Sequence, residues 1–118
     1  MYNNVISDNM DEDFSRIKVS EPTKNLDKVV FYKIVTFDSK GIVECTRRYS
    51  DFIALRDAWK KRIPGLYYPF LPPKKIFGNT DKEHLEERCF LLEQFLKKVY
   101  RINYLVQSEE LSVFCRTD

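Results

Sequence analysis

The stretch VVFYKIVTFDSKGIVECTRRYSDF, residues 29–52, decides the fold. Its first nine residues, 29–37, are rich in β-branched and aromatic side chains, which favour a strand. Residues 38–41, Asp-Ser-Lys-Gly, are typical of a turn, and residues 42–49 have the composition of a returning strand. Upstream, residues 15–20 alternate in polarity and place Ile17 and Val19 on one face. The chain is therefore expected to begin with an antiparallel meander of three strands.

After residue 49 the apolar residues recur at helical spacing. Ser50 or Asp51 is expected to cap a first helix, which Pro64-Gly65 would end. Its apolar stripe consists of Phe52, Leu55, Trp59 and Ile63. Residues 66–80 contain three prolines and predict a loop with an extended, polyproline-like centre.

Two further helices are expected after this loop. The longer one begins near Asp81, and a short one runs from about Ser108, its possible cap, to Phe114. The buried stripe predicted for the longer helix consists of Leu85, Cys89, Leu92, Phe95, Leu96 and Val99. Strands first and helices after them predict an α+β fold, in which a three-stranded antiparallel sheet precedes a helical subdomain.

The length and composition indicate one soluble domain. The chain has 118 residues, of which 43% are hydrophobic, enough for a single core. We expect residues 1–13 to be an acidic flexible tail and residues 14–118 to form the domain. No apolar run approaches the ~20 residues of a transmembrane segment, and the acidic start does not resemble a secretory signal. Three scattered cysteines indicate a reducing, cytosolic compartment.

The charge is unevenly distributed along the chain. The formal net charge is +2, but residues 1–13 carry four carboxylates and no cation, so the remainder holds +6. Residues 40–75 contain nine basic and three acidic side chains and account for that whole excess. A local basic region predicts an anionic partner, which composition alone leaves open as a phospholipid headgroup, a nucleic acid or an acidic protein.

Catalytic chemistry finds little support in the sequence. His84 is the only histidine, and it falls among charged residues at the start of a predicted helix. No metalloprotease or paired-cysteine metal motif is present, and three glycines do not make a nucleotide-binding loop. The spacing of Glu83, Glu86 and Glu87 indicates that their carboxylates lie on a solvated helix face. We therefore predict a binding module with no catalytic residues, no metal site and no cofactor.

Arg47-Arg48-Tyr49 stands where the third strand meets the first helix. Such a junction offers the amide groups of a helix N-terminus to an anion, and a guanidinium matches phosphate oxygens in pairs. Alternation along the strand separates Arg48 from Arg47, which we expect to be a general surface charge. The alternative is that both arginines are merely solvated and that Tyr49 belongs to the core.

Two other features could contribute cations. The proline-rich segment 68–75 ends in Lys74 and Lys75 and would present them on a stiff backbone. It could instead be a rigid connector, or a Pro-x-x-Pro ligand for an SH3-type domain, although Tyr68 and Phe70 are expected to pack. Arg88 borders the apolar stripe of the second helix and could lean toward the end of the sheet or form a salt bridge.

Together these three features resemble the phox-homology (PX) domain family. Residues 47–52, RRYSDF, match its R(R)[YF]xxF signature, and residues 68–74, YPFLPPK, match its ΨPxxPxK loop. Residues 87–96, ERCFLLEQFL, resemble its long helix, in which an arginine precedes a leucine-rich stripe. The resemblance covers roughly residues 15–114 and is greatest to the sorting nexins. Residues 100–105 depart from it, which leaves the end of the long helix open.

The resemblance implies a site for the headgroup of phosphatidylinositol 3-phosphate. Arg48 would hold the 3-phosphate, Lys74 the 1-phosphate, and Arg88 the 4- and 5-hydroxyls, where further phosphates would lack room. Tyr49 would stack beneath the inositol ring. Ile76 and Phe77 follow the loop and become candidates for insertion into the bilayer, unless Phe77 packs under the loop.

The function that the resemblance implies is recruitment to endosomal membranes during protein sorting. The protein would be cytoplasmic and peripheral on membranes that contain phosphatidylinositol 3-phosphate, with other trafficking proteins as further partners. The alternative is a PX-like protein-interaction domain with weak or no lipid specificity. Nucleic-acid binding is disfavoured because the basic residues gather at one place rather than along an extended face.

Overall fold

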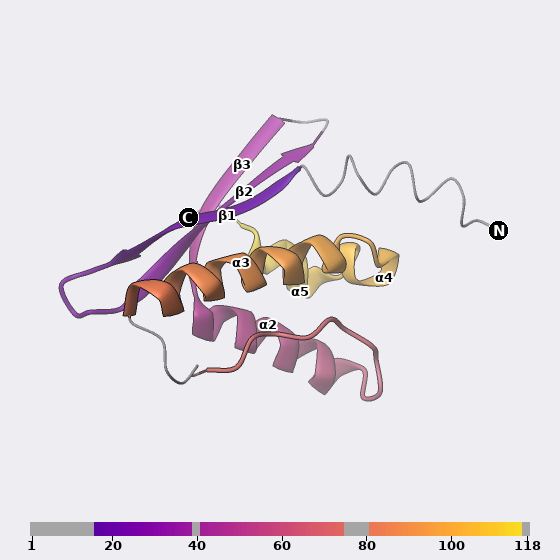
Figure 1. Cartoon of the computed structure of the whole chain (residues 1–118). Coiled ribbons are helices and arrows are strands. Elements are labelled where there is room, and N and C mark those ends of the chain that lie inside the picture. Colours follow the sequence, from indigo (N-terminus) through magenta and orange to yellow (C-terminus); the bar gives the residue numbers. More distant parts are fainter. Residues whose placement is uncertain (1–15, 39–40, 75–80, 117–118) are drawn as a thin grey trace.

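The computed structural model describes residues 16–38, 41–74 and 81–116. The acidic tail and the centre of the predicted turn after residue 38 lie outside these residues. Three strands, β1 (Ile17–Lys24), β2 (Val30–Asp38) and β3 (Gly41–Arg48), form an antiparallel sheet in the order β1-β2-β3 (Figure 1). The predicted meander is therefore confirmed. Strand β1 runs four residues further than expected, across an irregularity in its pairing between Ser20 and Thr23.

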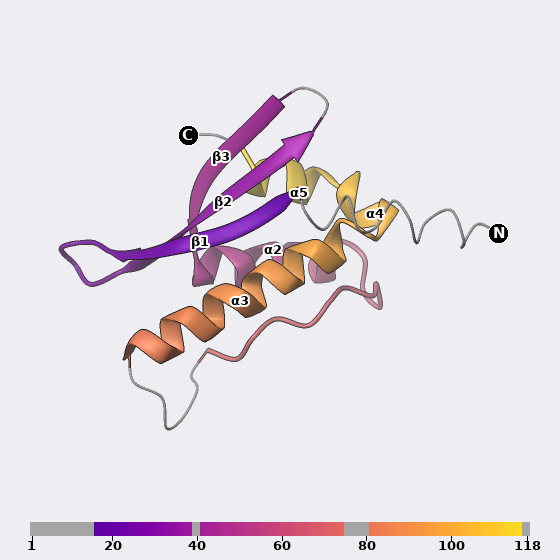
Figure 2. The ribbon, with the colours of Figure 1, turned by 45° about the horizontal axis from the view of Figure 1, so that its top comes forward.

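The inner face of the sheet carries the residues that alternation predicts. Ile17 and Val19 of β1 are buried, and Ile34 of β2 pairs with the buried Cys45 of β3. Phe37 and Ile42 pair on the opposite face and remain exposed. All the helices of the described chain lie on the inner side of the sheet, as the two views in Figures 1 and 2 agree.

Helix α2 (Tyr49–Arg62) follows β3 without a connecting loop. Its N-cap is Arg48, so the predicted cap at Ser50 or Asp51 is wrong; Asp51 instead lies in the first turn and accepts a 2.7 Å hydrogen bond from the Arg48 amide. The helix ends before Pro64 as expected. Ile63 is its C-cap and is 40% exposed, so it does not continue the buried stripe.

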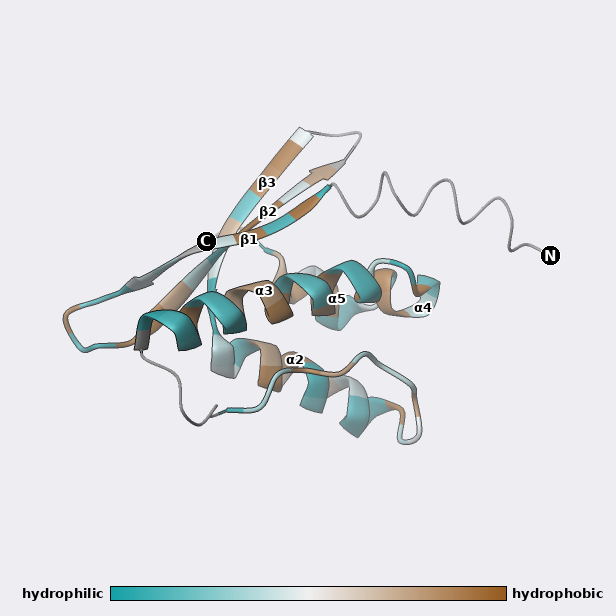
Figure 3. Cartoon of the chain, viewed as in Figure 1, coloured by the Kyte–Doolittle hydropathy of each residue, from teal (hydrophilic) through white to brown (hydrophobic). Residues whose placement is uncertain are grey.

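Helix α3 (Asp81–Val99) begins where predicted and packs along β1. Leu92, Phe95, Leu96 and Val99 are buried, and hydrophilic and hydrophobic residues alternate around its turns (Figure 3). One buried residue is a carboxylate, Glu93, which the apolar pattern missed. It accepts a 2.9 Å hydrogen bond from the Val19 amide of β1 and is joined by Lys97 at 3.1 Å.

Two short helices close the chain. Helix α4 (Asn103–Val106) occupies the stretch that departs from the family pattern, and α5 (Glu109–Phe114) matches the predicted terminal helix. Ser108 caps α5 as expected, because its hydroxyl accepts from the Leu111 amide at 3.2 Å. The same hydroxyl accepts from the indole of Trp59 at 2.9 Å and so joins α2 to α5.

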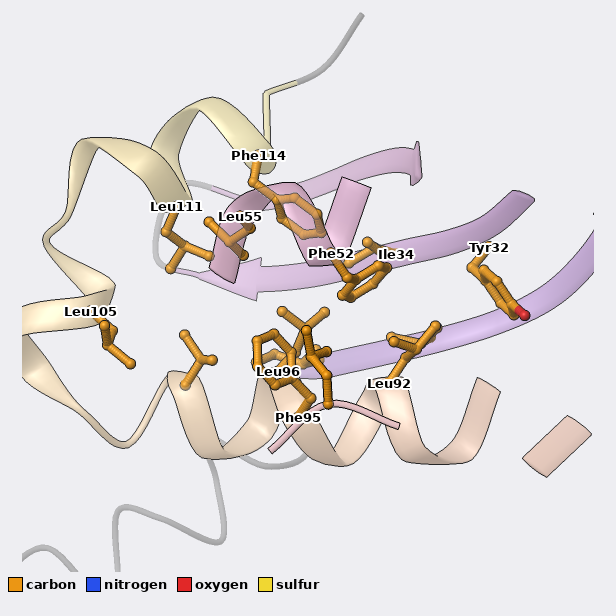
Figure 4. Packing of buried hydrophobic residues seen from close by; sticks show 14 of the residues in the cluster. Tyr32, Ile34, Phe52, Leu55, Leu92, Phe95, Leu96, Leu105, Leu111 and Phe114 are labelled. Atoms are coloured by element: carbon orange, nitrogen blue, oxygen red, sulfur yellow. The ribbon is translucent and has the colours of Figure 1, made fainter. Parts of the chain in front are cut away.

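The core lies between the sheet and the helices (Figure 4). Phe52 of α2 is at its centre and makes edge contacts with Phe95 of α3 and Phe114 of α5, at centroid distances of 6.2 and 4.9 Å. Burial of Phe52 therefore fixes the first turns of α2 against the sheet. Arg48, which immediately precedes α2, and Tyr49, its first residue, take their positions from this packing.

The proline-rich loop packs through its prolines. Pro69 and Pro72 are buried, whereas Phe70 is 81% exposed. The expectation that Phe70 packs is therefore wrong. Tyr68 is half-buried and packs against the core, as expected. A Pro-x-x-Pro ligand must expose its prolines to an aromatic groove, so the burial of both prolines argues against an SH3-type ligand.

Candidate functional site

Arg48 stands at the point where β3 becomes α2. Its backbone is extended and its side chain is exposed. The amide group of Arg48 is taken by the Asp51 carboxylate at 2.7 Å, which fixes the entry into the helix without using the guanidinium. The side chain is thus presented beside the first amides of a fourteen-residue helix, whose dipole favours an anion at this end.

Tyr49 links α2 to the proline-rich loop. Its hydroxyl donates a 2.6 Å hydrogen bond to the carbonyl of Pro72, and the side chain is half-buried. The guanidinium carbon of Arg88 lies over the ring, 4.2 Å from its centroid. This is cation–π geometry, so Arg88 occupies one face of the ring.

Arg88 enters from α3 and is 9% exposed. Its Nη2 atom donates to the carbonyls of Pro73, at 3.2 Å, and Lys74. These contacts tie the backbone of the loop to α3 at Pro73 and Lys74, while the Lys74 side chain remains exposed. Arg88 leans over the end of the sheet, as the sequence suggests, but its hydrogen-bond partners are loop carbonyls rather than a carboxylate.

The four predicted residues line one cavity of about 400 Å³. They come from three separate sequence motifs, and the fold brings them together at the end of the sheet where β3 passes into α2. The residues that line it are Lys28, Val29, Val30, Tyr32, Arg48, Tyr49, Ser50, Lys74 and Arg88. Four of these are cations and none is a carboxylate. A cavity of this size and charge suits a compact polyanion with a ring that can lie on Tyr49.

Two lining residues, Lys28 and Tyr32, were missed by sequence reasoning. Tyr32 belongs to the β-branched and aromatic stretch that predicts a strand, and it is fully buried. Burial raises the pKa of its hydroxyl, which the charge of Arg88 only partly offsets. The hydroxyl therefore stays protonated at neutral pH. Within the described chain, neither this hydroxyl nor Nε of Arg88 has a hydrogen-bond partner of normal geometry.

Arg47 does not act as a general surface charge, so that expectation is wrong. Its side chain points to the helical face of the sheet, where Nε donates to the Phe114 carbonyl at 2.8 Å and Nη2 to the carbonyl of Arg116. Nη1 donates to the neighbouring Thr46 carbonyl at 2.6 Å. Arg47 thus holds the end of α5 against β3, and the two adjacent arginines have separate tasks.

A larger cavity, of about 820 Å³, lies between α2 and the short C-terminal helices. Its charged lining residues are Arg47, Arg62, Asp51, Glu109 and Glu110, so negative groups outnumber positive ones. Arg62 is also engaged by Glu110 in a pair of contacts at 2.5 and 3.0 Å. Size alone therefore does not make this cavity an anion site.

Ile76 and Phe77 lie outside the described residues, so the structure leaves their predicted insertion open. Among the described residues, no cluster of three or more histidine, cysteine or acidic side chains could hold a metal ion. Burial raises the pKa of the Cys89 and Cys115 thiols, which disfavours the nucleophilic thiolate. No helix in the described part of the chain has the length and apolarity needed to cross a membrane.

Comparison with known proteins agrees with the fold and with the motifs. Residues 35–118 match the family model for the PX domain. The chain is 36% identical over 98 residues to rat (Rattus norvegicus) sorting nexin-20, covering 77% of this chain and 31% of that protein. It is 34% identical over 76 residues to sorting nexin-17 of Pongo abelii, covering 64% and 16%. The chain thus spans less than a third of the length of these curated relatives.

A solved structure shares the same architecture at a similar level of identity. The X-ray structure of a designed CISK-PX domain superposes with a TM-score of 0.75 at 30% sequence identity. The match covers 86% of this chain and 98% of the other. Both the order of the elements and their packing are therefore those of a known domain type.

Proposed function

Because the chain belongs to the PX domain family, we propose that it binds phosphatidylinositol 3-phosphate and recruits the protein that carries it to endosomal membranes. The match to the PX family and the sorting nexin relatives support a phosphoinositide-binding role in membrane trafficking. The observation that carries this proposal is the cavity at the β3–α2 junction, whose lining contains four cations, two tyrosine rings and no carboxylate.

In this proposal the 3-phosphate binds beside Arg48. The guanidinium supplies paired donors, and the amides at the start of α2 add their partial positive charge. Lys74 meets the 1-phosphate at the mouth of the cavity, where a diester needs only a point charge. Since Lys74 follows the loop that Tyr49 and Arg88 hold, its backbone is fixed before the lipid arrives.

The inositol ring would lie on Tyr49, with its hydroxyls turned to Arg88. The Arg88 guanidinium covers one face of the Tyr49 ring at 4.2 Å, so an inositol ring that packs against the uncovered part of Tyr49 would lie beside Arg88 as well. Hydroxyls at positions 4 and 5 would then accept from the guanidinium edge that the loop carbonyls leave unused. Ile76 and Phe77 remain proposed as apolar side chains that enter the bilayer next to the bound headgroup.

The proposal is tested with liposomes of defined composition. Vesicles that contain phosphatidylinositol 3-phosphate should pellet the protein, whereas vesicles with unphosphorylated phosphatidylinositol, phosphatidylinositol 4-phosphate or phosphatidylserine at matched charge should pellet much less. Raising the salt concentration should weaken binding because exposed charges contribute, but the preference for the 3-phosphate should persist. Equal binding to all anionic vesicles would contradict the proposal and favour a protein-interaction domain without lipid specificity.

A further inference from the structure

The connection between β1 and β2 is a closed, internally hydrogen-bonded turn. The side-chain oxygen of Asn25 accepts from the amides of Asp27 and Val29 at 3.0 and 2.9 Å. The main chain adds two more bonds, from Lys28 to Asn25 at 2.9 Å and from Asn25 to Val29 at 3.0 Å. In both ribbon views this connection and the beginning of α3 lie at the same end of the molecule (Figures 1 and 2). The turn therefore has a defined shape close to the candidate site.

Lys28 adopts a backbone conformation that lysine rarely adopts. Its φ angle is 64°, and it is the single non-glycine residue with positive φ in the described ranges. Glycine takes this conformation without steric cost, whereas a side chain on Cβ makes it unfavourable. Strain of this kind is often retained where a side chain has a task. Here the side chain that is retained lines the cationic cavity.

The proposed assignment of the headgroup leaves Lys28 without a role. Arg48 and Lys74 take the 3- and 1-phosphates, and Arg88 is held by loop carbonyls and by the Tyr49 ring. Among the described residues, no carboxylate forms an ion pair with Lys28, and the lining of the cavity contains none. The cavity therefore holds one exposed positive charge more than a headgroup with two phosphates uses.

From this geometry we infer that Lys28 binds a third phosphate on the inositol ring, so that the cavity accepts a 3-phosphoinositide carrying a further phosphate at position 4 or 5. The inference rests on the proposed function and refines its ligand. A phosphate monoester suits Lys28 better than a hydroxyl, because an ammonium is a strongly hydrated point charge that gains most from a full negative charge. This departs from the expectation that further phosphates would lack room: a phosphate at position 4 or 5 would turn from Arg88 toward Lys28, which lines the same cavity, and Arg88 would keep the remaining hydroxyl.

The test measures soluble headgroups by calorimetry. Inositol 1,3-bisphosphate is compared with the 1,3,4- and 1,3,5-trisphosphates, using the wild type, Lys28→Gln and Lys28→Gly. The wild type should bind at least one trisphosphate about tenfold more tightly than the bisphosphate, as expected for one added charge-assisted contact. Both variants should lose that advantage and keep their affinity for the bisphosphate within about threefold. Lys24→Gln, an exposed lysine on the same hairpin outside the cavity, should behave as the wild type.

The glycine variant separates binding from folding. Lys28→Gly removes the charge and also relieves the positive φ, so its melting temperature should not fall below that of Lys28→Gln. Similar losses for the bisphosphate and the trisphosphates would overturn the inference, because Lys28 would then add only general charge. A wild type without any preference for a trisphosphate would overturn it too. Failure of the proposed function looks different: Arg48→Ala would then bind all three headgroups as the wild type does.

Discussion

The guanidinium carbon of Arg88 lies 4.2 Å from the centre of the Tyr49 ring, and this contact joins two helices to the loop between them. Tyr49 belongs to the first turn of α2 and donates to the Pro72 carbonyl at 2.6 Å. Arg88 belongs to α3 and donates to the carbonyls of Pro73 and Lys74. Residues from distant parts of the chain thus fix three consecutive loop residues, Pro72 through Tyr49 and the next two through Arg88. The cavity is therefore largely formed before a ligand binds, which lowers the ordering cost of binding.

Replacing Arg48 should abolish specific lipid binding and leave the fold intact. Its guanidinium is exposed and its structural contact is made by the backbone amide, so Arg48→Ala removes a ligand contact alone. The loss of one charge-assisted pair should be about 1.5–3 kcal/mol, or about ten- to a hundredfold in affinity for phosphatidylinositol 3-phosphate vesicles. Arg16→Ala, an exposed arginine outside the cavity, is the matched control. Unchanged vesicle binding by Arg48→Ala would remove this residue from the site.

Replacing the neighbouring Arg47 should lower the stability of the fold and leave lipid binding unchanged. Arg47→Ala removes the donors that hold the carbonyls of Phe114 and Arg116, so α5 should loosen while the lipid site stays in place. We expect the free energy of unfolding to fall by about 1–2 kcal/mol, as for partly exposed charge-assisted hydrogen bonds. Denaturant unfolding measures this, with affinity for the soluble headgroup measured at low temperature. If Arg47→Ala were as stable as the wild type but no longer bound lipid, the roles assigned to Arg47 and Arg48 would have to be exchanged.

Sequence periodicity is sufficient to predict the strands and helices, but it does not predict the contacts where one element meets the next. The strands, both long helices and the Ser108 cap follow from alternation, helical spacing and one capping residue. Alternation also separated Arg47 from Arg48, but what each side chain contacts depends on α5, which is distant in sequence. The α2 cap was misplaced because the arginine that precedes the helix serves as N-cap through its backbone, a role usually taken by smaller polar residues.

The missed site residues have physical explanations as well. Lys28 lies twenty residues before Arg48 in a turn whose positive φ no residue pattern indicates. Tyr32 fits the apolar face of a strand, and only the packing of α3 places Arg88 beside its hydroxyl. Glu93 follows the charged pattern of its helix, yet it is buried because the edge of β1 supplies a partner, the Val19 amide. For Tyr32 and Glu93 the deciding contact is between elements and is absent from local sequence.

Removing the Tyr49 hydroxyl should weaken binding moderately. Tyr49→Phe keeps the aromatic ring beneath Arg88 but loses the bond to Pro72, so the loop before Lys74 becomes less well fixed. A neutral hydrogen bond is worth about 0.5–1.5 kcal/mol, which corresponds to about two- to tenfold in headgroup affinity. Tyr49→Ala should lose more because the ring is removed too. Equal affinities for Tyr49→Phe and the wild type would show that the hydroxyl does not position the loop.

The ion pair between Arg62 and Glu110 should make stability depend on pH in the acid range. The hydrogen bond from Arg62 lowers the pKa of Glu110 below its usual value. A carboxylate whose pKa is lower in the folded state stabilises the fold above its unfolded pKa, and this contribution is lost as the pH falls through the folded pKa. The difference in melting temperature between the wild type and Glu110→Gln should therefore be largest near neutral pH and shrink below about pH 4. A difference that is constant from neutral pH to pH 3 would contradict the assigned pairing.

Changing both Ile76 and Phe77 to serine should weaken vesicle binding more than headgroup binding. Two apolar side chains that enter the bilayer add a contribution that salt does not screen, and full burial of one is worth about 1.5–3 kcal/mol. Partial burial at the interface gives less. We therefore expect vesicle affinity to fall by about tenfold or more, while affinity for inositol 1,3-bisphosphate remains nearly unchanged. If Phe77 instead packs beneath the loop and positions Lys74, both affinities and the melting temperature should fall together. Vesicle pelleting beside calorimetry separates the two results, and equal losses in both assays would exclude membrane insertion by these residues.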